Sequence, residues 1–138
     1  MMTVSTLDDA RRVLIVDDNI DTAELLVGLL ASWGHRAIHA VDGRAALAVA
    51  PEFLPEVVLL DIGLPDLDGY EVARRLCRIP VLDATRLVAM TGHGDVADRE
   101  RAWDAGFNEH MVKPPDLDKL RRVITDGPES VRIRVSRG

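Results

Sequence analysis

The sequence predicts an α/β fold: a doubly wound, five-stranded parallel sheet covered by helices on both faces, forming a three-layer α/β/α sandwich. First, five short strand-like segments alternate with five stretches of helical periodicity over roughly 115 residues. Second, the runs at 13–16 and 57–60 are apolar at every position, which is typical of strands buried on both faces. Third, the chain has 138 residues, whereas an eight-stranded α/β barrel needs about 250.

The predicted strands end at polar residues. The run at 13–16 is rich in β-branched side chains and stops at two aspartates. The run at 57–60 is closed by Asp61, and the run at 87–90 by Thr91. The predicted strands are residues 13–16, 36–41, 57–60, 87–90 and 110–112.

Helices are predicted where apolar residues recur at helical spacing between capping and stop signals. Asn19 or Asp21 offers an N-cap for the first helix, and Gly34 follows it where a C-terminal stop belongs. The second helix is expected to stop near Pro51 and Pro55, because proline lacks the N–H that continues a helix. Asp95 is expected to cap the fourth helix. In the first helix the apolar residues at helical spacing fall within 23–30. The other predicted helices are residues 44–50, 70–78, 95–105 and about 115–125, with Pro115 in the first turn of the last.

Composition excludes several classes of function. The 17 Lys and Arg against 23 Asp and Glu give a formal net charge of −6, which argues against a general nucleic-acid binder. No run approaches the about 20 apolar residues of a membrane-spanning helix, and residues 1–12 lack the apolar core of a secretory signal. The single Cys77 cannot form an intramolecular disulfide. We therefore expect a cytoplasmic protein that binds neither membrane nor nucleic acid.

The predicted strand ends carry an unusual set of side chains. Asp17 and Asp18 follow the first strand, Asp61 the third, Thr91 the fourth and Lys113 the fifth. Ligands of open parallel sheets bind outside the carboxyl ends of the strands, so these side chains are expected to converge on one rim. The set comprises three carboxylates, one hydroxyl and one ammonium.

This set suits phosphoryl chemistry with a metal ion. Crowded carboxylates repel one another, and a hard divalent cation relieves that repulsion; oxygen-only ligands favour Mg²⁺, with Mn²⁺ as a possible substitute. Asp61 can then act as a nucleophile that forms an aspartyl phosphate. Lys113 would pair with one phosphoryl oxygen and Thr91 would donate a hydrogen bond to another.

Each residue also has an ordinary structural explanation. Asp18 suits an N-cap, Thr91 a turn, and Lys113 a solvated charge. Asp66 and Asp68 are assigned to the turn and the helix cap that follow the third strand. Independent capping roles do not explain acid, hydroxyl and ammonium at the ends of four different strands, so the argument depends on the whole set.

In these motifs and their spacing the chain resembles the receiver domain of two-component response regulators, close to chemotaxis regulators and to receivers of hybrid histidine kinases. The resemblance implies a flavodoxin-like fold, with Asp61 as phosphoacceptor and Thr91 and Lys113 as the switch hydroxyl and phosphate-binding lysine. It further implies that Asp17, Asp18, Asp61 and the backbone carbonyl of Gly63 hold Mg²⁺. The segments that carry the resemblance are VLIVDD at 13–18, LLDIGLP at 59–65, DG at 68–69, MTG at 90–92 and VKP at 112–114.

Several positions depart from the family pattern. His110 occupies the place where the family often has a Tyr or Phe ring that swings inward on activation. It is either a titratable replacement for that ring or a half-buried histidine of an edge strand. Gly92 replaces a usual Ala. Gly63 and His93 occupy positions that modulate dephosphorylation in the family, and His93 either reaches the phosphate or faces solvent.

The resemblance implies a phosphorylation-operated receiver rather than an enzyme. Its partners would be a histidine kinase or histidine phosphotransfer protein, and a downstream protein or second copy bound by residues 95–105 and 110–125. We expect an extension at 1–11, the receiver at 12–126 and a tail at 127–138, with no attached output domain. The tail is expected to be either disordered, or an added edge strand or a contact with an acidic partner.

Two alternatives remain open. One is an interaction module that works without phosphorylation. The other is a phosphatase with an aspartyl nucleophile, although Asp17-Asp18-Asn19 lacks the Asp-x-Asp spacing of haloacid dehalogenase-type enzymes.

Overall fold

The computed structural model describes residues 10–92 and 99–125, and it confirms the predicted fold class. Five strands form one sheet in the order β2-β1-β3-β4-β5, and every neighbouring pair is parallel. The order reverses beside β1, so the chain winds outward in both directions from the centre of the sheet. The strands are β1 (Arg12–Val16), β2 (Arg36–Ala40), β3 (Val57–Asp61), β4 (Arg86–Thr91) and β5 (Glu109–Val112).

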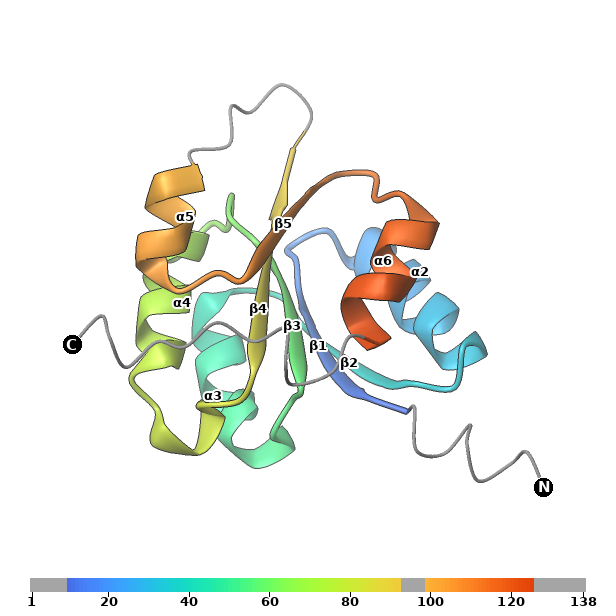
Figure 1. The fold of residues 1–138 in the computed structure, drawn as a ribbon, viewed down its shortest axis with the longest axis horizontal. Coiled ribbons are helices and arrows are strands. Elements are labelled where there is room, and N and C mark those ends of the chain that lie inside the picture. The colour runs from blue at the N-terminus through green and yellow to red at the C-terminus, as the bar shows by residue number, and fades with distance from the viewer. Residues whose placement is uncertain (1–9, 93–98, 126–138) are drawn as a thin grey trace.

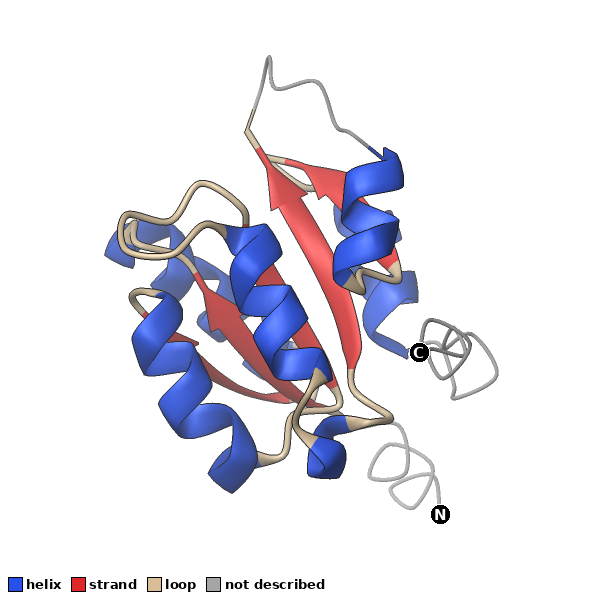
Figure 2. Cartoon of the chain, turned by 90° about the vertical axis from the view of Figure 1, so that its left-hand side faces the viewer, coloured by secondary structure: helices blue, strands red, loops and turns tan. Residues whose placement is uncertain are grey.

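Helices cover both faces of the sheet (Figure 1). The helices α2 (Ile20–Ser32) and α6 (Leu117–Thr125) lie on one face. The opposite face, nearer the viewer in Figure 2, carries α3 (Gly43–Phe53), α4 (Gly69–Cys77) and α5 (Arg99–Ala105), and a short 3₁₀ helix, η1 (Pro80–Leu82), follows α4. Among the helices of residues 10–92 and 99–125, none combines the length and apolarity needed to cross a bilayer.

The apolar strands supply two separate cores. Leu14 and Val16 of β1 pack with α3 and α4, whereas Val13 and Ile15 pack with α2 and α6. Successive side chains of a strand point to opposite faces, so a strand covered on both sides must be apolar throughout. Every residue of β3 is buried. This explains the unbroken apolar runs in the sequence.

Within the described residues, two predicted helix boundaries lie more than one residue from the observed ones. The helix α3 continues through Pro51 to Phe53, because the N–H of Leu54 still bonds the carbonyl of Ala50 and proline removes only one bond in the last turn. It ends where Leu54 adopts a left-handed conformation with φ of 55°. The helix α6 begins at Leu117 rather than near Pro115.

The caps explain where the helices begin. Asn19, not Asp21 or Asp18, accepts the N–H of Thr22 at the start of α2. Asp116 accepts the N–H of Lys119 at 3.1 Å, which places the cap of α6 one residue after Pro115. The cap predicted at Asp95 lies outside the described residues.

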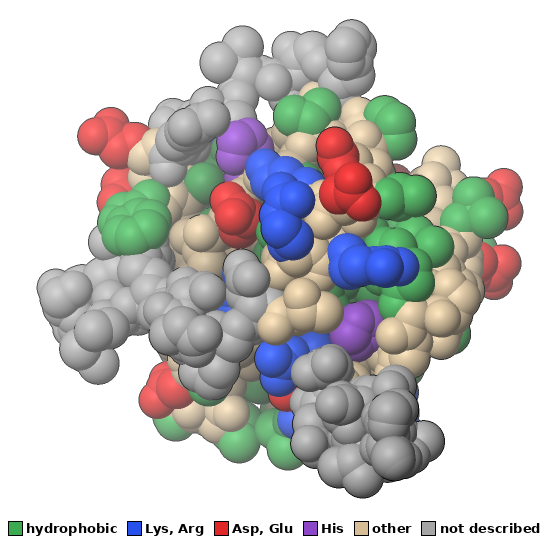
Figure 3. Space-filling view, turned by 45° about the vertical axis from the view of Figure 1, so that its right-hand side comes forward, with side chains coloured by type: hydrophobic (Ala, Val, Ile, Leu, Met, Phe, Trp, Pro, Cys, Tyr) green, Lys and Arg blue, Asp and Glu red, His purple; other side chains and the backbone are tan. Residues whose placement is uncertain are grey.

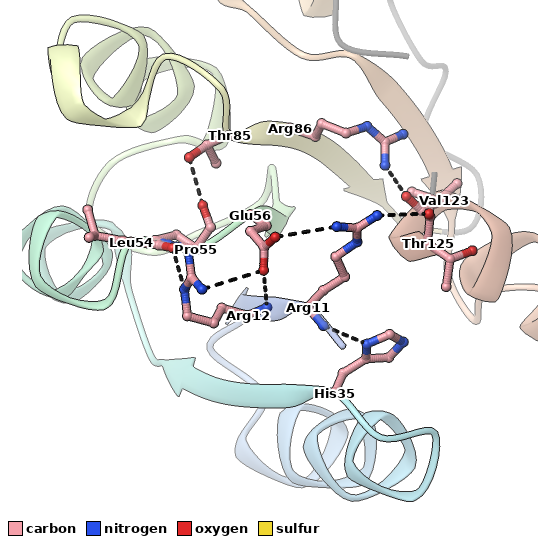
Figure 4. A network of polar contacts seen from close by, with 10 residues as sticks. All are labelled: Arg11, Arg12, His35, Leu54, Pro55, Glu56, Thr85, Arg86, Val123 and Thr125. Carbon is pink, nitrogen blue, oxygen red and sulfur yellow. Dashed lines mark hydrogen bonds and ion pairs between the residues drawn. The ribbon is translucent and has the colours of Figure 1, made fainter. Parts of the chain in front are cut away.

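A polar network joins the elements at the edge of the sheet where the strands begin (Figure 4). Glu56 accepts the backbone N–H of Arg12 at 2.9 Å and the guanidinium of Arg11 at 3.4 Å. Arg11 also donates to the carbonyl of Thr125, and Arg86 donates to another carbonyl in the last turn of α6. Cations stabilise a helix C-terminus, so the network holds α6 against the first residues of β1 and β4.

Two glycines provide a matched test of the packing. A Cβ on Gly69 would lie 2.4 Å from the Cα of Ile62, whereas a Cβ on Gly28 would meet nothing within 4 Å. We expect Gly69→Ala to lower the free energy of unfolding by about 2 kcal/mol through overpacking. Gly28→Ala should raise it by about 0.5–1 kcal/mol, because alanine loses less backbone entropy in a helix. Urea unfolding followed by circular dichroism measures both free energies. Equal changes in the free energy of unfolding of the two variants would contradict the close packing of α4 on the end of β3.

Candidate metal and phosphoryl site

The turn after β1 holds the first two carboxylates of the site. The N–H of Asp17 donates to the carbonyl of Ala40 at 3.1 Å, which continues the pairing of β1 with β2. One carboxylate oxygen of Asp17 accepts the N–H of Asn19 at 2.9 Å, and the ring of His39 contacts the carbonyl of Asp17 at 2.9 Å. Asp17 is buried and Asp18 is exposed. The turn therefore holds one carboxylate inside and presents the other to solvent.

The third carboxylate lies at the end of β3. Asp61 is buried, and its Oδ1 accepts the N–H of Gly63 at 2.9 Å. The backbone of Gly63 thus lies directly beside the acid. The N–H of Gly69 donates to the carbonyl of Ile62 at 3.0 Å, so the start of α4 packs on the chain just beyond Asp61. A side chain at Gly69 would collide with this backbone.

Lys113 joins the two buried acids. Its ammonium donates to Asp61 at 3.1 Å and to Asp17 at 3.3 Å. Burial lowers the pKa of Lys113, but the hydrogen bond and charge of Asp61, and then the charge and hydrogen bond of Asp17, outweigh burial and raise it above its ordinary value. The side chain is therefore cationic at neutral pH. A cis peptide bond joins Lys113 to Pro114.

The three carboxylates fit a divalent cation. Asp17, Asp18 and Asp61 each offer one oxygen, and the three oxygens lie within 4.8 Å of one another. The cluster has three carboxylates and one ammonium, which pairs with two of them, so acidic groups outnumber basic ones. Hard oxygen ligands with an exposed member match the preference of Mg²⁺ for a few carboxylates and retained waters. On the face shown in Figure 3, by contrast, acidic and basic side chains are interspersed with apolar ones.

Thr91 connects the site to the edge strand. Its hydroxyl donates to the carbonyl of Met111 in β5 at 3.3 Å, and its own carbonyl accepts the N–H of Lys113 at 2.7 Å. The side chain is buried, with 1% of its surface exposed. In this conformation the hydroxyl therefore belongs to the contact between β4 and β5 rather than to the carboxylate cluster.

A cavity of about 220 Å³ is lined by Thr91 and His110, among other residues. The ammonium of Lys119 donates to the backbone carbonyl of His110 at 3.2 Å, which ties α6 to β5. His110 is half-buried. This exposure does not distinguish a titratable replacement for the aromatic ring from a half-buried histidine of an edge strand. Further residues that line the cavity include Tyr70, Ala102, Trp103 and Phe107.

The structure thus brings together four of the five predicted strand-end groups, and it places the other, Thr91, against β5. Gly92 is half-buried, and His93 lies outside the described residues. The sequence analysis did not identify His39 as a neighbour of Asp17, because no local sequence pattern indicates that contact. It also assigned Asp66 to its own turn, whereas Asp66 binds the start of α3.

Comparison with known proteins identifies the relatives of this chain. The profile of the response regulator receiver domain matches residues 13–125. Sporulation initiation phosphotransferase F of Bacillus subtilis is 31% identical over 114 residues, which cover 82% of this chain and 90% of the relative. Transcriptional regulatory protein TcrA of Mycobacterium tuberculosis is 37% identical over 109 residues, which cover 79% of this chain. The matched region spans only 42% of the length of TcrA.

A solved structure shows the same fold with a metal. The receiver domain of sensor histidine kinase PA1611 from Pseudomonas aeruginosa PAO1 superposes with a TM-score of 0.74 at 29% identity. The match covers 83% of this chain and 94% of that domain. The structure of that domain has a magnesium ion coordinated in its active-site cleft.

Metal binding by the acidic cluster can be tested through stability. Mg²⁺ at about 100 times its dissociation constant should stabilise the wild-type fold by about 2.7 kcal/mol. Asp18→Asn removes an exposed ligand without disturbing the core, and a tenfold weaker site would lose about 1.4 kcal/mol of that gain. Thermal melts with and without Mg²⁺ measure the difference. Asp21→Asn, an exposed acid outside the cluster, should retain the wild-type gain, and equal losses in both variants would contradict the assignment.

Proposed function

Because the chain belongs to the receiver domains of two-component response regulators, we propose that it accepts a phosphoryl group on Asp61 in the presence of Mg²⁺. The observation that carries the proposal is the ammonium of Lys113, which contacts the carboxylates of Asp17 and Asp61 within a cluster of three acids. One acid is thereby placed beside both a cation and a candidate metal site. This arrangement suits a nucleophile that must approach a dianionic phosphoryl group.

The proposed reaction is a phosphoryl transfer from phosphohistidine. The P–N bond of the donor breaks, and its electron pair leaves with the imidazole nitrogen, which then takes a proton. An O–P bond forms to a carboxylate oxygen of Asp61, giving an acyl phosphate. The carboxylate attacks as an anion, so no base is required to activate it.

The residues around Asp61 have distinct proposed roles. Lys113 moves from the carboxylates to a phosphoryl oxygen and neutralises part of its charge. The N–H of Gly63 holds one oxygen of Asp61 in place. Asp17, Asp18, Asp61 and the carbonyl of Gly63 would hold Mg²⁺, which supplies charge neutralisation at the phosphoryl oxygens when bound.

The proposed signal leaves through the edge of the sheet. For Thr91 to donate to a phosphoryl oxygen, its hydroxyl must release the carbonyl of Met111 in β5. That release changes the contact between β4 and β5 and reaches the surface formed by α5, β5 and α6. We propose that this surface binds a downstream protein or a second copy of the chain.

The proposed donors are a histidine kinase and a histidine phosphotransfer protein, acting in the cytoplasm. The similarity to a kinase receiver and to a sporulation phosphotransferase supports a position in a phosphorelay. The receiver catalyses only its own phosphorylation and slow dephosphorylation in this proposal.

A second candidate function is protein binding without phosphorylation. The observation that favours it is His110, which departs from the aromatic residue usual in the family. In that case the acidic cluster would bind a metal without accepting phosphate. The two functions differ in whether Asp61 accepts a phosphoryl group.

Phosphorylation is tested with acetyl phosphate and Mg²⁺. We expect one phosphoryl group per chain by intact mass spectrometry and none in Asp61→Asn, because the amide is not a nucleophile. Asp21→Asn, which keeps the cluster intact, should be labelled like the wild type. Binding without phosphorylation predicts no label in any variant. Sustained turnover of a phosphate ester would instead indicate a phosphatase.

The switching step is tested at Thr91. We expect Thr91→Val to accept the phosphoryl group but to lose the response of β5 and α5, because the hydroxyl is absent. Thr91→Ser keeps the hydroxyl and should retain the response. Amide chemical shifts with and without beryllofluoride and Mg²⁺ measure it. Shifts in β5 that persist in Thr91→Val would exclude the hydroxyl as the link.

A further inference from the structure

Asp66 forms a bridge between two elements that are distant in the sequence. It lies in the loop between β3 and α4, yet its Oδ1 accepts the N–H of Gly43 at 2.9 Å and its Oδ2 accepts the N–H of Arg44 at 3.0 Å. Both donors belong to the first turn of α3. The first N–H groups of a helix have no partner within the helix, so a carboxylate supplied from elsewhere binds them well.

This helix already has a cap of its own. Asp42 accepts the N–H of Ala45 at 2.8 Å, as an N-cap does. The bond from Asp42 joins residues three positions apart, whereas the bonds from Asp66 span more than twenty. Asp66 therefore adds a connection between the loop and α3, beyond the capping of the helix.

The loop and the helix are in close contact at this point. A Cβ on Gly43 would lie 2.7 Å from Cγ2 of Val72 and 3.3 Å from Oδ1 of Asp66, so glycine allows this approach. The N–H groups of Gly43 and then Arg44 lower the pKa of Asp66 despite some desolvation, and the carboxylate stays ionised at neutral pH.

The two bonds hold the part of the loop that follows the phosphoacceptor. At its start, the N–H of Ile62 bonds the carbonyl of Met90 in β4 at 3.3 Å. At its end, the N–H of Gly69 bonds the carbonyl of Ile62. Gly63 lies between Ile62 and Gly69 in the chain. Asp66, also between them, attaches the loop to α3.

We propose that Asp66 is a positioning residue that holds the 61–69 loop against the N-terminus of α3, so that Gly63 and Asp61 keep the geometry that a divalent cation requires. The inference rests on the proposed function, since it assigns the backbone of Gly63 to the metal site. Mg²⁺ demands near-octahedral geometry, so a loop that moves when its attachment is lost binds the ion less tightly. Loss of a group that hydrogen-bonds a metal ligand typically weakens binding by about 10-fold or more. Asp66 acts one step further out, on the loop that carries Gly63, and we expect its loss to have an effect near the lower end of that range.

Three variants separate positioning from helix capping and from charge. Asp66→Ala removes the bridge to α3, whereas Asp42→Ala removes a cap of the same helix and leaves the bridge intact. Arg44→Ala removes the long 3.7 Å ion pair to Asp66 but keeps the backbone N–H that Asp66 binds. A fourth variant, Asp66→Asn, retains one acceptor oxygen and provides a conservative rescue.

The measurement is the Mg²⁺ dissociation constant, obtained by titrating amide shifts of each folded variant. We expect about 10-fold weaker binding in Asp66→Ala, an intermediate value in Asp66→Asn, and wild-type affinity in Asp42→Ala and Arg44→Ala. Melting temperatures should fall similarly in Asp66→Ala and Asp42→Ala, since each loses a capping carboxylate.

Two results would overturn the inference in distinguishable ways. Wild-type Mg²⁺ affinity in Asp66→Ala, or an equal loss in Asp42→Ala, would show that Asp66 only caps α3, while the proposed function would stand. Absence of Mg²⁺ binding and of phosphorylation in the wild-type protein would instead remove the proposed function on which the inference rests.

Discussion

The ion pairs of Lys113 with Asp17 and Asp61 are the interaction on which the site depends. Two buried carboxylates at neighbouring strand ends would repel each other, and the ammonium between them, at 3.1 and 3.3 Å, offsets that repulsion. The ammonium of Lys113 contacts both acids at similar distances rather than pairing with only one of them. In the proposed function, a divalent cation and an arriving phosphoryl group would replace these contacts, so that no buried charge is left unpaired.

The parallel sheet explains why these groups meet. The register pairs Val16 with Leu60, so β1 and β3 end side by side and their aspartates lie at the same edge. At the opposite edge Arg11 and Arg86 hold the C-terminus of α6. The two edges therefore have different roles, because one holds a helix to the sheet and the other leaves polar groups available to a ligand. Apolar strands between them keep water from both cores.

The sequence was sufficient to predict the fold and most of the site, for a physical reason. Strands buried on both faces must be apolar, and parallel strands end at one edge, so the pattern of residues predicts the convergence of Asp17, Asp61 and Lys113. Contacts between distant residues carry no such signal. Neither the bridge from Asp66 to α3 nor the passage of α3 through Pro51 follows from local pattern, because each depends on what packs beside it.

The conformation of Thr91 is the other feature that the sequence pattern could not reveal, and it bears most directly on the proposed switching step. Its carbonyl accepts the N–H of Lys113, while its hydroxyl donates to the carbonyl of Met111 on the adjacent strand. A single residue therefore touches both the segment that carries the ammonium of Lys113 and the strand that borders the cavity beside His110. Any rotation of this hydroxyl toward the acids must break its bond to β5. In the proposed function, loss of that bond would free the edge strand to move, and this link would run through Thr91 and Met111 rather than through the side chain at position 110.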